Sequence, residues 1–144
     1  MITFNVENVK MPHIDRKLVR KWIETVTFEH GGRTVGSLNY IFCDDERILQ
    51  VNREFLGHDY YTDIITFDYS DPHKVSGDMY ISLDTVLSNS SLFNSSYERE
   101  LLRVIIHGVL HLCGINDKGP GERAVMESHE NRALDLWYNR QFQI

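Results

Sequence analysis

Cysteine is scarce in this chain, with Cys43 and Cys113 the two present among 144 residues. Their positions follow no spacing typical of metal ligands, which excludes a metal site built from paired cysteines. We expect both to be reduced, buried thiols, as in a cytosolic protein, and we expect Cys113 to serve packing.

Long apolar runs are also missing from the sequence. No stretch approaches the roughly 20 residues that a helix needs to span a bilayer, so no membrane partner is expected. Residues 1–7 lack the basic segment and following apolar run of a signal peptide. The sequence therefore predicts a cytoplasmic protein.

Basic residues are outnumbered, with 15 Lys and Arg against 21 Asp and Glu and a formal net charge of −6. This balance argues against tight general binding to nucleic acid. The exception is the segment 10–21, which contains Lys10, Arg16, Lys17, Arg20 and Lys21 against Asp15 alone. A basic helix face on an acidic body can hold phosphates, although an ordinary solvated helix face would have the same composition.

The rest of the composition is that of a globular protein, 42% hydrophobic and 25% charged, and the length fits one domain. Apolar patterns predict strands at 2–9, 35–42, 64–68 and 77–82. Helical periodicity and capping residues predict helices at 14–27, 44–57, about 97–113 and about 120–138. A run of small polar residues, 88–96, separates the last strand from the third helix. Since no repeat or long linker divides the chain, we predict a single α+β domain over residues 1–144.

Two histidines interrupt the most apolar segment of the chain, residues 104–117. His107 and His111 are four apart, so a helix places them on one face, where both imidazoles can reach one metal ion. Gly114 fits the left-handed position that ends such a helix. Asp117, three residues later, could return as an oxygen ligand, and we predict a mononuclear metal site from these three side chains.

Chance is the alternative explanation for this spacing. The chain has seven histidines, and a buried His is often no more than a hydrogen-bonded core residue. Two features favour the metal: an unpaired imidazole in an apolar segment costs free energy, and the Gly114 turn brings a carboxylate to the same helix end.

The residue after the first histidine is Gly108, where metalloproteases of the H-E-x-x-H type carry the Glu that acts as general base. The protease interpretation is therefore weakened. A glycine inside a helix costs about 1 kcal/mol relative to alanine. Its presence predicts a close approach by another backbone or by a substrate.

Three segments, in order, resemble the YbeY family of bacterial ribosomal-RNA maturation endoribonucleases. His-Gly-Val-Leu-His-Leu-Cys-Gly-Ile-Asn-Asp, at 107–117, is similar to the family signature H-G-x-L-H-L-x-G-Y-D-H. Residues 56–67 resemble its G-K-D-x-P-T-D-V-L-S-F segment, and 77–81 its G-D-I-x-I strand. Glu122, Met126 and Glu130 also fall at the family's spacing after the signature.

The chain departs from the family pattern at the site itself. Asp117 occupies the position of the third metal-binding His, and Leu56 and His58 stand where basic residues are usual. Further departures are Ile115 and Asn116 in place of Tyr-Asp, and Tyr61 in place of Pro. Two His and one carboxylate suit nickel, iron or manganese as well as zinc, which the resemblance favours. Phosphate contacts would shift to Arg53 or to the basic face formed by Arg16, Lys17, Arg20 and Lys21.

The resemblance implies a zincin-like mixed β-sheet flanked by helices, with the site in a cleft. It implies metal-dependent cleavage of single-stranded RNA during small-subunit ribosomal RNA maturation and ribosome quality control, with the small ribosomal subunit and assembly proteins as partners. Three protein ligands would leave one position open for water. Asp63 and Asp78 could orient a His ligand or water, or could cap a turn or strand end. No separate general base is visible in the sequence.

Two other functions remain open at this stage. One is a zincin-like hydrolase of peptides or small molecules, against which the missing Glu at position 108 counts. The other is a non-catalytic ribosome-assembly factor whose metal is structural, which the Asp ligand and the acidic balance keep open.

Overall fold

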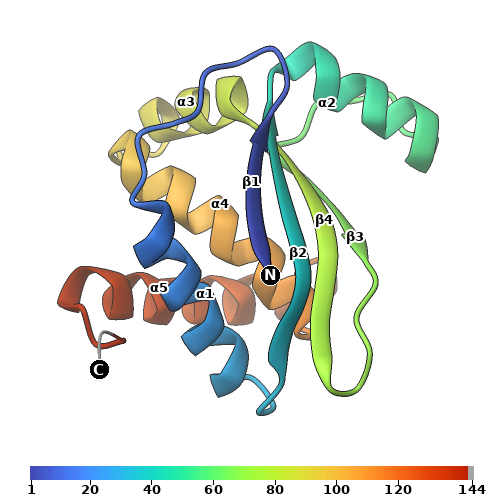
Figure 1. Cartoon of the computed structure of the whole chain (residues 1–144). Coiled ribbons are helices and arrows are strands. Elements are labelled where there is room, and N and C mark those ends of the chain that lie inside the picture. The colour runs from blue at the N-terminus through green and yellow to red at the C-terminus, as the bar shows by residue number, and fades with distance from the viewer. Residues whose placement is uncertain (143–144) are drawn as a thin grey trace.

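A four-stranded mixed sheet forms the centre of the computed structural model, which describes residues 1–142 (Figure 1). The strands are β1 (Ile2–Val6), β2 (Thr34–Cys43), β3 (Ile64–Asp68) and β4 (Lys74–Ser82). Their order is β1-β2-β4-β3, with β1 and β4 parallel to β2 and β3 antiparallel to β4. The strand β3 therefore lies at one edge of the sheet.

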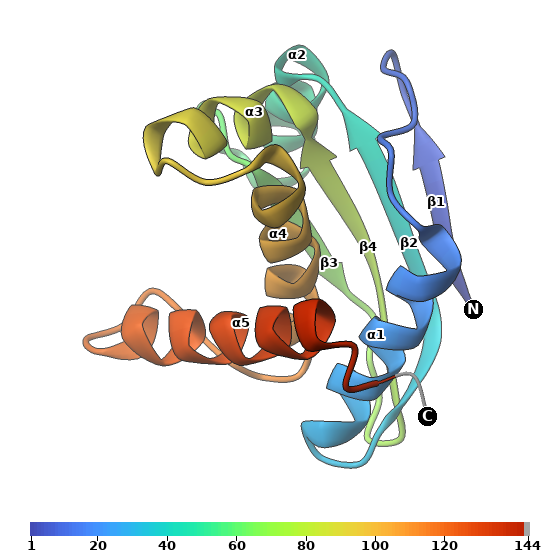
Figure 2. The ribbon, with the colours of Figure 1, turned by 90° about the vertical axis from the view of Figure 1, so that its left-hand side faces the viewer.

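Helices cover both faces of this sheet, and most lie on one of them. They are α1 (Arg16–Glu29), α2 (Asp45–Val51), α3 (Leu83–Leu92), α4 (Tyr97–Leu112) and α5 (Glu122–Asn139). Figures 1 and 2 show α1, α4 and α5 on one side of the sheet and α2 near the far side of its upper end. Within residues 1–142, no helix combines the length and apolar character that crossing a membrane requires. The predicted α+β class, a mixed sheet flanked by helices, is confirmed.

The main core lies between the sheet and the helices α1, α4 and α5. Strand register aligns alternate apolar side chains in rows on this face; Phe4, Tyr40 and Met79 form one such row. The helix α4 is buried along most of its length, and it contributes Leu102, Ile105, Val109 and other apolar residues to this core. The Tyr40 hydroxyl donates to the Ile105 carbonyl at 3.0 Å, which ties α4 to the centre of the sheet.

A smaller core lies on the opposite face, under α2. Ile48 and Val51 of that helix pack with Cys43 and Ile65 of the sheet. The helix continues past Val51 as a π-helical turn, Asn52–Leu56, and ends at Gly57 in the left-handed conformation, φ 66°. The continuous helix predicted over 44–57 is thus present, but its last turn is wider than an α-helix.

The structure corrects two predicted strand boundaries and contains one helix that the sequence did not predict. The first strand ends at Val6 rather than residue 9, because Asn8 adopts a left-handed φ of 62° that a strand cannot continue through. The strand β4 begins at Lys74 rather than residue 77. The helix α3 was missed because its Ser and Asn residues have weak helix propensity; Ser82 caps it, and Val86 and Ser90 are buried four apart.

Gly108 lies where α4 crosses the edge of the sheet. A Cβ at this position would collide with Sδ of Met79 and would lie 2.9 Å from Cδ1 of Ile64. The expected close approach is therefore real, but side chains of β3 and β4 make it, rather than another backbone or a substrate.

We predict that Gly108→Ala destabilises the metal-free protein by about 1 kcal/mol, because overpacking costs about 1–3 kcal/mol and improved helix propensity returns about 1. Urea unfolding measures this change. Ser91→Ala, at an exposed position of α3, is the control that alters propensity without a collision. A Gly108→Ala protein as stable as wild type would mean that Met79 moves aside freely.

Candidate metal centre

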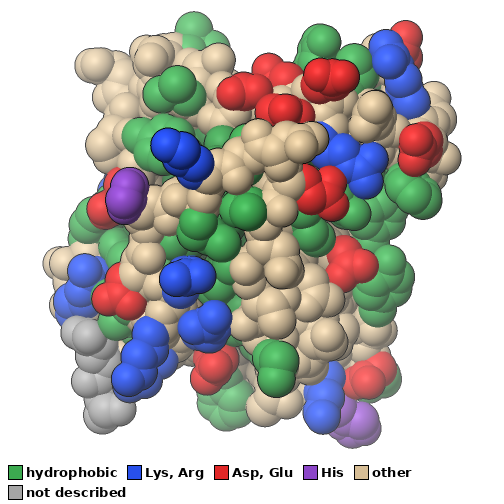
Figure 3. All heavy atoms as spheres, turned by 45° about the horizontal axis from the view of Figure 1, so that its top comes forward, with side chains coloured by type: hydrophobic (Ala, Val, Ile, Leu, Met, Phe, Trp, Pro, Cys, Tyr) green, Lys and Arg blue, Asp and Glu red, His purple; other side chains and the backbone are tan. Residues whose placement is uncertain are grey.

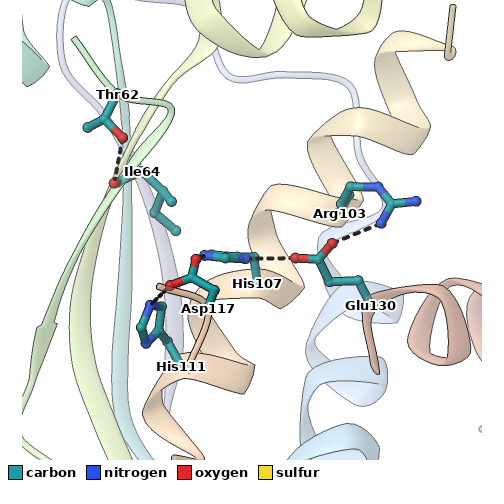
Figure 4. Close-up of polar contacts among 7 residues, drawn as sticks. All are labelled: Thr62, Ile64, Arg103, His107, His111, Asp117 and Glu130. Carbon is teal, nitrogen blue, oxygen red and sulfur yellow. Dashed lines mark hydrogen bonds and ion pairs between the residues drawn. The ribbon is translucent and has the colours of Figure 1, made fainter. Parts of the chain in front are cut away.

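The predicted ligands come together at the C-terminal end of α4 (Figure 4). His107 and His111 lie one helical turn apart, and Gly114 reverses the chain with φ 96°. Backbone bonds from Gly114 N to His111 O and from Ile115 N to Leu110 O, both 3.0 Å, close this helix end as a Schellman motif. The reversal returns Asp117 to the histidines, with each Nε2 atom 3.4 Å from an Asp117 carboxylate oxygen.

The three side chains fit a single cation. Their ligand atoms lie within 4.8 Å of one another. The Oδ1 atom of Asp117 is buried and has no hydrogen-bond partner among the described residues, an arrangement that a buried carboxylate oxygen avoids unless a cation takes the place of a donor. Ligands about 2.0–2.2 Å from one tetrahedral ion lie roughly 3.3–3.5 Å apart. Each imidazole lies at this spacing from one oxygen of Asp117, His107 from Oδ2 and His111 from Oδ1. His107, His111 and Asp117 could therefore hold a metal ion.

A carboxylate on α5 fixes the orientation of the first histidine. The Nδ1 atom of His107 donates to Oε2 of Glu130 at 2.7 Å, which leaves Nε2 as the lone-pair atom facing Asp117. The other oxygen of Glu130 accepts from Arg103 at 2.8 Å, and Arg103 also donates to Asn131 at 2.8 Å. Figure 4 shows this chain running from Arg103 through Glu130 to His107.

The pKa of His107 reflects this partner. Burial alone lowers it, but the hydrogen bond to Glu130 and the negative charges of Glu130, Asp117 and Asp63 outweigh burial, so the pKa is raised above the ordinary value. The surroundings of His107 therefore favour a positive charge there, whether from a proton or from a cation.

Two clefts meet at this centre. One, of about 370 Å³, runs past β3 and the loop before it and reaches His111 and Lys118. The other, of about 760 Å³, runs between α4 and α5 past the Ser95–Ser96 turn. Asp63, His107 and Asp117 line both clefts. The candidate metal centre thus lies at the junction of two openings.

Of the two aspartates expected beside the ligands, the structure places Asp63 there. Burial raises the pKa of its carboxyl, while the charge on His107 and the backbone N–H groups of Asp63 and Ile64 act in the other direction. Asp78 lies on the opposite face of the sheet, where its Oδ1 accepts from Asn39 at 2.9 Å. The structure therefore does not bring Asp78 to the metal ligands.

The basic residues proposed for phosphate contact are not among the residues that line the two clefts. Arg16, Lys17 and Lys21 are exposed on α1, on a side of the molecule where Figure 3 shows several Lys and Arg side chains. Arg20 donates to the carbonyl of Ile2 at 3.0 Å and lies over the ring of Phe4, and Arg53 pairs with Asp59. Among the described residues, none of these five lines either cleft.

Other cations line the clefts, and sequence reasoning missed them. Lys118 lies in the first cleft, and Arg99, Arg103 and Arg123 lie in the second. Arg103 was detectable, because it precedes His107 by four residues and so shares its helix face. Lys118 directly follows a proposed ligand. Arg123 carried no such signal.

Known proteins match this chain over nearly its whole length. Residues 1–138 match the protein family described as Endoribonuclease YbeY. A protein of that name from Phocaeicola vulgatus is 60% identical over 136 residues, which are 94% of this chain and 98% of that protein. One from Bacteroides fragilis is 58% identical over 135 residues, 94% of this chain and 96% of that protein. The solution structure of the protein TM1509 from Thermotoga maritima has a TM-score of 0.63 and 26% identity, over 100% of this chain and 96% of that one.

The fold and the site define an α+β protein with a His, His, Asp group that could hold a metal ion at the junction of two clefts. The chain belongs to the YbeY family. The resemblance carried by the three sequence motifs is confirmed, and with it the class of enzyme, an endoribonuclease.

We predict that Glu130→Gln lowers the metal affinity about 10- to 100-fold, as removal of such an outer hydrogen-bond partner does at other metal sites. The amide lacks the negative charge that favours the cation. Competition with a chromophoric chelator measures the affinity. Asp135→Asn, at an exposed position of the same helix outside both cleft linings, is the control, and equal affinity in both variants would contradict the role of Glu130.

We also predict that Asp63→Asn stabilises the metal-free protein at pH 7. The raised pKa means that ionised Asp63 disfavours the folded state above this pKa, and Asn removes that penalty. The advantage should shrink as the pH falls through the raised pKa and vanish below the unfolded value of about 3.9. Urea unfolding at both ends of this range tests the sign, and a variant less stable than wild type at pH 7 would refute it.

Proposed function

We propose that this protein is a metal-dependent endoribonuclease that cleaves single-stranded RNA during small-subunit ribosomal RNA maturation and ribosome quality control in the cytoplasm. Its partners would be the small ribosomal subunit and assembly proteins. The observation that carries the proposal is the junction of two clefts at His107, His111 and Asp117. A chain cut internally must extend in two directions from the reacting phosphate, and two openings permit this.

The proposed metal is zinc. Two imidazole nitrogens and one carboxylate oxygen form a three-ligand set of the kind that catalytic zinc uses, although nickel, iron and manganese accept the same donors. When bound, such an ion supplies Lewis acidity, which polarises a phosphoryl oxygen and lowers the pKa of water.

The partial burial of the ligands supports a single-stranded substrate. The side chains of His107, His111 and Asp117 are 21%, 35% and 18% exposed, so a reacting phosphate must descend into the cleft. The regular backbone of an A-form duplex resists this distortion, whereas a flexible single strand can enter and turn its bases outward. Lys118 on one side and Arg99 and Arg123 on the other would then contact flanking phosphates.

Two further groups have supporting roles: one orients a ligand, and the other accepts a proton. Glu130, held by Arg103, keeps His107 in one tautomer and one orientation. Asp63 lines both clefts, and its raised pKa brings the carboxylate closer to the range of an effective proton acceptor at neutral pH. We assign Asp63 to this role.

The test compares wild type with His111→Ala and Asp117→Ala for metal content and for cleavage of a single-stranded RNA. We expect one equivalent of metal in wild type, and loss of both metal and cleavage in the variants, because each removes one of three ligands. Asp135→Asn, on α5 outside both cleft linings, is the control that should retain both. A duplex of the same sequence should be cleaved far more slowly.

Three results would overturn parts of the proposal. Metal bound by wild type without any cleavage would favour an assembly factor with a structural metal, and unfolding on chelation would support that conclusion. Equal cleavage of single strand and duplex would refute the single-strand preference. A wild type without metal at neutral pH would refute the centre itself.

A further inference from the structure

Aromatic side chains are exposed in the loop that leads from the π-helical turn into β3. His58 and Tyr60 line the smaller cleft together with His107, His111 and Lys118. Tyr60 is 52% exposed. Large rings that remain exposed at the mouth of a site have no role in the core, which makes them candidates for contact with a ligand.

The two rings form an ordered pair. Their centroids are 5.1 Å apart, with an angle of 19° between the planes, and the Tyr60 hydroxyl and His58 Nδ1 lie 3.0 Å apart, within hydrogen-bond distance. The rings are therefore roughly parallel and are held by each other rather than by burial. Such a pair offers a flat, preformed surface.

The backbone beneath the pair is also fixed. Asn52 is 1% exposed, and its side chain donates to the Tyr60 carbonyl at 2.8 Å. The amide of His58 donates to the Asn52 carbonyl at 3.1 Å. One buried polar side chain in the π-helical turn thus sets the position of the ring pair relative to the cleft.

We propose that Tyr60, supported by His58, is a stacking platform for an unpaired nucleobase of the RNA strand that enters the smaller cleft. The proposal rests on the proposed function and adds a base-binding subsite to it. Aromatic rings stack on the faces of exposed bases in single strands, and this contact needs no particular base. Lys118, which lines the same cleft, supplies the positive charge for an adjoining phosphate.

A nucleobase fits this surface better than an apolar peptide side chain does. The cleft also presents polar groups, among them Thr66 and Asp68, which can meet the polar edges of a base and the ribose. A purely apolar ligand would leave these groups without partners. An aromatic surface beside a cation is the combination that single-strand-binding proteins use.

The first arm of the test measures binding and turnover in wild type, Tyr60→Ala and Tyr60→Phe. Tyr60→Ala should weaken RNA binding and raise KM roughly 5- to 150-fold, the range for loss of one stacked base, with a smaller effect on kcat. Tyr60→Phe keeps the ring and should stay close to wild type. Tyr61→Ala, which removes a 61% exposed ring of the same loop outside both cleft linings, is the matched control.

The second arm reports stacking directly. A single-stranded RNA carrying 2-aminopurine at one position at a time is bound to metal-free wild-type protein, since the platform does not require the metal. Stacking quenches this base, so one position should lose fluorescence in wild type, Tyr60→Phe and Tyr61→Ala, but not in Tyr60→Ala. Quenching and KM that are unchanged in Tyr60→Ala would overturn the platform.

The two arms separate the platform from the catalytic proposal. If wild type cleaves RNA but quenching is the same with and without the Tyr60 ring, the endoribonuclease activity stands and the platform is refuted. Tyr60-dependent quenching without cleavage by metal-loaded wild type would support the platform and refute the catalytic proposal.

Discussion

The carboxylate of Glu130 joins the two helices on which the centre depends. It is 7% exposed, and it accepts from Arg103 and His107 of α4 while belonging to α5 itself. A buried carboxylate without partners would be costly, so the position of α5 and the orientation of His107 are linked. The orientation of this candidate ligand therefore depends on the packing of α4 against α5.

The second support for the site comes from the sheet. The edge strand β3 carries Ile64 on the face that α4 crosses, and Gly108 lets the helix approach it closely. On the other face, the π-helical turn after α2 holds the loop that precedes β3. The contact is the hydrogen bond from the Asn52 side chain to the Tyr60 carbonyl. Helices on both faces of the sheet therefore support the segments around the candidate ligands. Pre-organised catalytic groups require such support from regular secondary structure.

The sequence predicted those parts of the site that depend on local geometry. His107 and His111 are fixed by helix periodicity, and Asp117 by the Gly114 turn, so a reader of the sequence could place all three. Glu130 was noted for its spacing, but its contact with His107 depends on how α5 packs, which no local pattern encodes.

The two aspartates show the same limit. Asp63 and Asp78 each adjoin an apolar strand, yet strand alternation directs Asp78 to the face away from α4. Gly77, directly before Asp78, carries no side chain. The apolar pattern of the sequence therefore does not show which face of the sheet Asp78 occupies. The helix α3 was missed for a different reason: residues 88–91 are Ser and Asn, which have weak helix propensity, and burial of Val86 and Ser90 holds the helix in place.

Charge explains why this acidic protein can still act on a polyanion. Asp63, Glu100, Asp117 and Glu130 line the second cleft, where Glu130 pairs with Arg103. Burial is the main reason that the pKa of both Asp63 and Glu100 is raised, and neighbouring carboxylates add to this effect. A divalent cation on the three ligands would offset the negative charge of these carboxylates, and it would allow a phosphate to approach. An ion held there would therefore favour the approach of a substrate phosphate in addition to its proposed chemical role.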